Sequence, residues 1–149
     1  MKFIRTNSEN KDFKGLVKQL DAYLAITDGD DHSFYNQFNT LDSIKYVIVV
    51  YENNIPLGCG AIKQFDDETL EIKRMYTTPQ SRGKGIASKL LVELEQWAKE
   101  LSYKKCVLET GIRQVEAIGL YKKNGFTLIP NYGQYKGVKD SRCFEKKLG

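Results

Sequence analysis

The feature that most restricts the fold of this chain is a strand pattern that leads through a glycine-rich turn into a long helix pattern. Residues 69–77, TLEIKRMYT, have the apolar and polar content of a strand. From Ile86 to Leu101, apolar residues recur at spacings of three and four, which predicts a helix with one buried face. A strand that continues directly into such a helix predicts a layered α/β or α+β domain.

The turn between these two patterns combines bare backbone with positive charge. Gly83 and Gly85 remove side chains where the helix begins, so the backbone amides there can approach a ligand closely. Arg82 and Lys84 add charge that attracts an anion. The turn therefore predicts a site for a phosphate or pyrophosphate group, although a flexible helix entry would also use these glycines.

The rest of the chain predicts an antiparallel meander followed by a strand–helix–strand crossover. Asn53 and Asn54 can take the positive φ of a tight hairpin turn. The closing strand alternates in polarity, which suggests an edge or half-exposed position. Strand patterns cover residues 2–5, 44–52, 55–65, 104–110, 126–129 and 141–148, and helix patterns cover residues 7–25, 32–38 and 114–125. In the first helix pattern, spacings of three and four predict one buried apolar stripe of Phe13, Leu16, Val17, Leu20, Tyr23 and Leu24.

Length and composition predict one cytoplasmic domain. The chain has 149 residues and a net charge of +4, and its lysines are spread among acidic residues, so charge alone does not imply nucleic acid as a partner. Three cysteines without CxxC spacing and a single histidine offer no Cys/His metal site. No stretch approaches the roughly 20 apolar residues of a membrane span, so no membrane association is expected.

The glycine-rich turn lacks residues that two common phosphate-binding motifs require, which reduces the number of phosphate compounds that it is expected to bind. The turn lacks the GxxxxGK[ST] spacing of nucleoside triphosphate loops, and it lacks the third glycine of GxGxxG. ATP and NAD are therefore poorly supported as ligands.

Two segments together resemble the GCN5-related N-acetyltransferase (GNAT) superfamily. The string QSRGKGIA after MYTTP is similar to the family signature Q/R-x-x-G-x-G/A at Gln80, Gly83 and Gly85, and AIGLYKKNGF about thirty residues later is similar to its next helix and strand. The resemblance covers residues 1–149 as a single domain. It implies a mixed, mostly antiparallel sheet of about six to seven strands, flanked by about four helices, with splayed parallel strands at the cofactor site.

The resemblance also implies acetyl-CoA as co-substrate, with no metal. Its pyrophosphate is expected on the turn and first helical residues, and its pantetheine arm along the end of the preceding strand. Many family members have an asparagine where this chain has Gln114, whose amide offers the same groups on a longer stem. The implied cofactor-binding residues are Met75, Tyr76, Thr77, Arg82, Gly83, Lys84, Gly85, Ile86, Ala87, Ser88 and Gln114.

Two catalytic roles follow from acetyl transfer to an amine, because the amine must lose a proton and the departing sulfur needs a donor. The resemblance implies Tyr121 as the donor, although its spacing also suits a core tyrosine. Glu71 is the first candidate for the base, because burial in a strand raises the pKa of a carboxylate. Glu71 could instead simply pair with Lys73 or Arg74.

The acceptor side is less clearly marked. The candidate acceptor residues are His32 and Tyr35, at the start of the helix pattern over residues 32–38, together with Glu109 and Tyr132. The acidic residues that precede His32, between two helix patterns, also suit a solvated turn. The expected activity is acetylation of a primary amine on a small or amino-acid-like molecule by direct attack in a ternary complex. Acetylation of a protein N-terminus or lysine, and a non-catalytic acyl-CoA sensor, are the alternatives. The chain is expected to be a monomer or homodimer.

Overall fold

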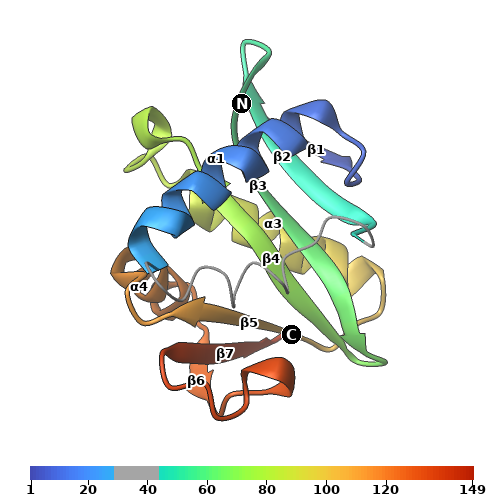
Figure 1. Cartoon of the computed structure of the whole chain (residues 1–149). Helices are drawn as coiled ribbons and strands as arrows, with labels where there is room; N and C mark the ends of the chain where they lie inside the picture. Colours follow the sequence, from blue (N-terminus) through green and yellow to red (C-terminus); the bar gives the residue numbers. More distant parts are fainter. Residues whose placement is uncertain (29–43) are drawn as a thin grey trace.

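A seven-stranded mixed sheet organises the chain in a computed structural model that describes residues 1–28 and 44–149 (Figure 1). The strand order is β1-β2-β3-β4-β5-β7-β6, and every neighbouring pair is antiparallel except β4 with β5. The predicted mixed, mostly antiparallel sheet is therefore confirmed. The elements are β1 (Lys2–Thr6), α1 (Lys11–Asp28), β2 (Tyr46–Glu52), β3 (Ile55–Asp66), β4 (Thr69–Thr77), α3 (Ile86–Glu100), β5 (Lys105–Gly111), α4 (Val115–Lys123), β6 (Thr127–Ile129) and β7 (Ser141–Lys147).

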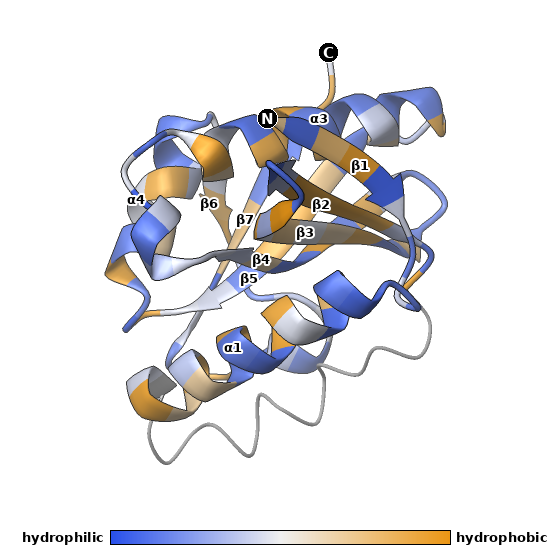
Figure 2. Cartoon of the chain, turned by 90° about the horizontal axis from the view of Figure 1, so that it is seen from above, coloured by the Kyte–Doolittle hydropathy of each residue, from blue (hydrophilic) through white to orange (hydrophobic). Residues whose placement is uncertain are grey.

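Helices cover both faces of the sheet, as Figure 2 shows with α3 on one side and α1 on the other. The apolar face of α3 packs with Ile48, Ile62 and Ile72 of the sheet in the larger core. The apolar face of α1 packs on Val47, Val49 and other residues of the opposite face. Both helices thus form because one apolar stripe is buried against strands whose side chains alternate between the two cores.

Helix α1 begins one residue after Asn10, later than the pattern over residues 7–25 predicts. The side-chain oxygen of Asn10 accepts a hydrogen bond of 2.8 Å from the amide of Phe13, which is the contact of a helix N-cap. The apolar residues of the stripe, Phe13, Leu16, Val17 and Leu20, are buried as predicted. The stripe is less covered at its end, where Tyr23 is 38% exposed and Leu24 is partly buried.

Strand β4 contains a bulge opposite β3, and it pairs with β5 over a short stretch only. Arg74 has a φ of +59°, and Arg74 and Met75 together oppose Gly60 of β3. A Cβ at Gly60 would lie 2.6 Å from the Met75 sulfur and 2.8 Å from a methyl group of Leu94, so any other residue would have to displace these side chains. Strands β4 and β5 pair only over Thr69 to Glu71, and beyond Glu71 they diverge. The predicted splayed parallel pair is therefore present.

The closing strand is not an edge strand, but it is half-exposed, which is the other position that its pattern predicts, since Ser141, Cys143 and Phe144 are buried and the other residues of β7 are partly or fully exposed. Strand β7 lies between β5 and β6, and the short β6 forms the edge. The charged residues that suggested an edge have partners in the structure. Lys146 lies 2.8 Å from Glu95 of α3, and Glu145 lies 3.6 Å from Lys105 of β5. Polar character in this strand reflects paired charges rather than an open edge.

Three α-helices lie in the described part of the chain, and the helix predicted over residues 32–38 falls outside it. None of the helices in residues 1–28 and 44–149 is both long and apolar enough to cross a membrane.

Candidate active site

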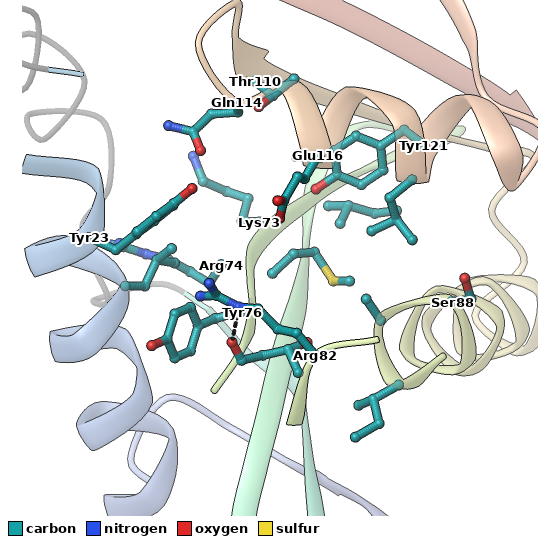
Figure 3. A pocket seen from close by; sticks show the side chains of 18 of the residues that line it. Tyr23, Lys73, Arg74, Tyr76, Arg82, Ser88, Thr110, Gln114, Glu116 and Tyr121 are labelled. Atoms are coloured by element: carbon teal, nitrogen blue, oxygen red, sulfur yellow. Dashed lines mark hydrogen bonds between the residues drawn. The ribbon is translucent and has the colours of Figure 1, made fainter. Parts of the chain in front are cut away.

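A cavity of about 500 Å³ is lined by the diverging ends of β4 and β5 together with α1, the start of α3, and α4 (Figure 3). Lys84 is exposed and is not among the lining residues, and neither is Tyr132. His32 and Tyr35 lie outside the described residues. The residues singled out from the sequence that do line it are Glu71, Met75, Tyr76, Thr77, Arg82, Gly83, Gly85, Ile86, Ala87, Ser88, Glu109, Gln114 and Tyr121.

The turn before α3 offers unoccupied backbone amides to this cavity. Gly83 and Gly85 have φ values of +79° and +77°, in the left-handed region that favours glycine. A Cβ at either position would meet no protein atom within 4 Å, so neither glycine is needed for close packing with the rest of the chain. Gly85 is the N-cap of α3 and makes no side-chain capping bond. The first amides of the helix can therefore bind an anion.

Arg82 turns its side chain towards α1 across the end of β4. Its Nε donates a hydrogen bond of 3.0 Å to the carbonyl oxygen of Thr77. Its guanidinium lies 5.4 Å from the ring of Tyr23 and 5.7 Å from the ring of Tyr76, which are cation–π distances. Arg82 thus brings positive charge to the cavity, and Tyr23 contributes to the site although its spacing suggested a core residue.

One edge of β4 is left without a strand partner among the described residues. On one side, Tyr76 and Thr77 pair with β3. On the other side, β5 has already diverged after Glu71. An extended ligand could therefore hydrogen-bond along this edge as an added strand would.

Tyr121 reaches the cavity from α4, and Figure 3 shows its hydroxyl directed into the open space. Its ring packs against Phe126 and Phe144, with centroid distances of 5.9 Å and 6.3 Å. No described residue hydrogen-bonds to its hydroxyl. Burial, with a smaller contribution from the charge of Glu109, raises the pKa of Tyr121, so the phenol stays protonated at neutral pH. The side chain is thus both packed and available as a proton donor.

A side-chain contact links α4 to the glycine turn. The side-chain amide nitrogen of Asn124, at the end of α4, donates a hydrogen bond of 3.1 Å to the hydroxyl of Ser88 in the first turn of α3. The same nitrogen donates to the carbonyl of Leu120 at 2.9 Å. Tyr121 is therefore held at a fixed place relative to the anion-binding amides.

Two carboxylates stand on the neighbouring strands where these diverge. Glu71 accepts a hydrogen bond of 2.6 Å from the hydroxyl of Tyr132, and its other oxygen lies 3.8 Å from Nζ of Lys73. Glu109 accepts a hydrogen bond of 2.7 Å from the hydroxyl of Ser141. Burial lowers the pKa of Lys73, opposed by the charge of Glu71. The expected Glu71–Lys73 pairing is therefore present alongside a tyrosine contact that the sequence did not suggest.

Arg74 is a site residue that sequence reasoning missed. The sequence suggests Arg74 only as a partner for Glu71, but its Nη1 lies 2.8 Å from Asp21 of α1. Its side chain is 3% exposed and lines the cavity. Its direction depends on the positive φ of the bulge, and no local sequence signal marks a non-glycine residue for that conformation.

Comparisons with known proteins agree with this geometry. The model of the acetyltransferase (GNAT) family matches residues 14–126. An IAA acetyltransferase of Azospirillum brasilense is 32% identical over 137 residues, which cover 89% of this chain and 88% of that protein. The chain therefore belongs to the GNAT family of acetyltransferases, as the two motifs indicate.

Solved structures support the same assignment. A Klebsiella pneumoniae protein assigned to the acyl-CoA N-acyltransferases is 28% identical, with a TM-score of 0.83 over 99% of this chain and 97% of that one. A GNAT family acetyltransferase from Elizabethkingia anophelis, solved with acetyl-CoA bound, is 25% identical, with a TM-score of 0.65 over 84% of this chain and 88% of that one.

Proposed function

We propose that this protein transfers the acetyl group of acetyl-CoA to a primary amine on a small or amino-acid-like molecule. The observation that carries the proposal is a single cavity that joins an anion-binding helix start, an unpaired strand edge, a buried tyrosine and two carboxylates. The Elizabethkingia anophelis relative, which has acetyl-CoA bound, supports the choice of co-substrate.

The residues around the glycine turn fit the polar end of acetyl-CoA. The amides from Gly83 to Ser88 hold the pyrophosphate at the start of α3, where the helix dipole also favours negative charge. Arg82 and Lys84 add positive charge near these amides. The open space beside Gly83 and Gly85 leaves room for the phosphate oxygens.

The unpaired edge of β4 fits the pantetheine arm. The arm lies along the backbone from Met75 to Thr77, where no described strand competes for the hydrogen-bonding groups. Gln114 stands across the cavity at the N-cap position of α4, 8% exposed, and offers its side-chain amide to the same arm.

Two side chains carry the proton transfers. Acetyl-CoA supplies an acetyl group activated as a thioester. Glu71 accepts a proton from the acceptor ammonium, which frees the nitrogen to form the new bond to the acetyl carbon. Tyr121, which burial keeps protonated, donates its phenolic proton to the sulfur as the carbon–sulfur bond breaks, and the second proton that the nitrogen loses on becoming an amide restores the phenol. The alignment of the two reactants in one cavity contributes further to the rate.

The acceptor side of the cavity suits a cationic amine. Glu71 and Glu109 supply negative charge, and the aromatic rings of Tyr23 and Tyr135 line the same space. Carboxylates with aromatic faces are groups that bind an ammonium ion. The acceptor ammonium is therefore expected to lie near Glu71.

A panel assay tests this function. Purified protein is mixed with acetyl-CoA and one amine at a time, including amino acids, polyamines, amino sugars and short peptides, and release of the CoA thiol is followed with DTNB. Release with small amines, above the rate without any amine, is the expected result. Release with peptides alone would contradict the small-molecule acceptor, and binding of acetyl-CoA without release for any amine would contradict transferase activity.

A further inference from the structure

The carboxylate of Glu71 is held from behind by a tyrosine that does not reach the cavity. The hydroxyl of Tyr132 lies 2.6 Å from Oε2 of Glu71, although the two residues are 61 positions apart in the sequence. Glu71 lines the cavity, as does Tyr135, whereas Tyr132 is not among the lining residues. Tyr132 is therefore connected to the cavity through its hydrogen bond with Glu71.

Two rings hold the ring of Tyr132 in place. Phe65 of β3 makes an edge contact with it, at a centroid distance of 5.0 Å and an interplanar angle of 73°. Tyr135 makes a second edge contact at 5.9 Å and 88°. Edge-to-face contacts of this kind favour one ring orientation. The direction of the hydroxyl is thus fixed by packing from two sides.

The backbone that carries Tyr132 is also fastened. The side-chain amide of Asn131 donates to the carbonyl of Val138 at 3.0 Å and to that of Ser141 at 3.1 Å. The amide of Tyr135 donates to the carbonyl of Tyr132 at 2.9 Å. These hydrogen bonds join residues within the connection between β6 and β7, and tie it to the first residue of β7, so Tyr132 has a defined position.

The two oxygens of Glu71 meet different neighbours. Oε2 accepts the bond from Tyr132, and Oε1 faces Nζ of Lys73 at 3.8 Å. Glu71 is itself 8% exposed, so these contacts are poorly screened by water. Burial, followed by the charge of Glu71, raises the pKa of Tyr132, so the tyrosine remains a donor and Glu71 the acceptor.

We propose that Tyr132 is a positioning residue that orients the Glu71 carboxylate towards the acceptor nitrogen. The proposal rests on the role of Glu71 as the base in the proposed function. It assigns Tyr132 no contact with the acceptor, which differs from the direct acceptor contact that the sequence suggests for this tyrosine. A hydroxyl-to-carboxylate bond of this length selects one rotamer of Glu71 among several.

The kinetic test uses Tyr132→Phe with the most active amine of the panel, because phenylalanine keeps the ring and loses only the hydroxyl. We expect kcat to fall about tenfold, which corresponds to one hydrogen bond to a charged group, while the KM for acetyl-CoA stays within about twofold. Tyr103→Phe is the matched control, because Tyr103 is partly buried and does not line the cavity. Its kcat should not change.

The double variant separates positioning from a general loss of structure. If Tyr132 acts through Glu71, Tyr132→Phe should have no further effect on kcat in a Glu71→Gln background. Equal losses in both backgrounds would overturn the proposal. If Glu71→Gln lowers kcat and Tyr132→Phe does not, only the positioning role is wrong. If Glu71→Gln keeps full kcat, the base and positioning roles both fail.

A spectroscopic measurement tests the contact without any acceptor. The side-chain carboxyl carbon of Glu71 is followed by NMR in protein labelled with carbon-13 glutamate and is assigned with Glu71→Gln. We expect this resonance to shift in Tyr132→Phe and to stay in place in Tyr103→Phe. An unmoved Glu71 signal in Tyr132→Phe would overturn the proposal, whatever the panel assay gives.

Discussion

Two regions of the cavity are built in opposite ways. The proposed phosphate cradle, residues 82–88, is one continuous segment that offers backbone amides at a helix start. In the carboxylate wall, Glu71 and Glu109 line the cavity, and Tyr132 and Ser141, which do not line it, donate hydrogen bonds to them from 61 and 32 positions away in the sequence. A site made of local backbone can be found from a short motif, whereas a site made of distant side chains depends on the whole fold.

This difference fits the different chemistry of the two substrates, the acyl-CoA and the acceptor amine. A phosphate group is the same in every acyl-CoA, so backbone amides that are independent of residue type serve it well. An acceptor amine differs from one enzyme to another, and the wall on which we propose that it binds uses side chains, which substitutions can change. We therefore expect changes in the cradle to alter the affinity for acetyl-CoA, and changes in the wall to alter turnover and the choice of acceptor.

The largest effect is expected from Tyr121→Phe, because we propose Tyr121 as the proton donor to the departing sulfur. Loss of its proton should lower kcat by about a hundredfold, the scale of one proton-transfer group. Isothermal titration should find the affinity for acetyl-CoA nearly unchanged, because Phe keeps the packing on Phe126 and Phe144. Tyr103→Phe serves as the control here as well. Full turnover in Tyr121→Phe would remove this residue from the donor role.

The next effect is expected from Gly85→Ala in the cradle. At a φ of +77° an alanine is strained, which should lower the free energy of unfolding by about 1 kcal/mol. The added Cβ meets no protein atom within 4 Å but would stand where the ligand approaches, so the affinity for acetyl-CoA should fall about tenfold.

Gly15→Ala is the matched control for this substitution. Gly15 lies within α1, where a Cβ also meets nothing within 4 Å, and its φ is not positive. Alanine should stabilise this helix by about 0.5–1 kcal/mol without affecting acetyl-CoA binding. Chemical denaturation and titration calorimetry measure both quantities. Equal acetyl-CoA affinities in the two variants would show that the glycine turn does not bind the co-substrate.

The contrast between the two regions also explains what the sequence could predict. The two ends of strand β4 are predicted correctly, and the glycine turn and Tyr121 are predicted as parts of the site and line the cavity. Each of these predictions depends on a local pattern or a motif. The bulge at Arg74 and the Glu71–Tyr132 bond are not predicted, because they depend on β3, on α1 and on a distant connection. The edge position predicted for β7 fails for the same reason, since its charges are paired with distant residues.

A smaller effect is expected from Arg82→Glu. Arg82 is exposed, so water and salt screen its charge, and reversal should weaken acetyl-CoA binding about fivefold at low salt and less at high salt. Lys18→Glu, an exposed change in α1 outside the cavity, makes the same change of net charge. Titrations at two salt concentrations measure the difference. If both variants bind equally, Arg82 does not contact the phosphates.

The smallest effect is expected in the rates at which two buried cysteines, Cys59 and Cys143, react with DTNB. Each rate reports how often the structure around that cysteine opens. Burial raises the pKa of Cys59 to about 12 and that of Cys143 to about 11, and both are fully buried, so DTNB should react slowly with the native chain at pH 8. Cys59 lies in β3, between two paired strands and beneath α1. Cys143 packs under Tyr132 and Tyr135 of the connection that closes the wall.

A connection held by a few side-chain bonds should open more often than a strand inside the sheet. We therefore expect Cys143 to be modified several-fold faster than Cys59 when labelling is stopped at intervals and the peptides are quantified by mass spectrometry. Faster labelling of Cys59 would mean that the sheet beside the cradle is the less stable region. In that case the wall, despite its assembly from distant residues, would be the more rigid half of the site.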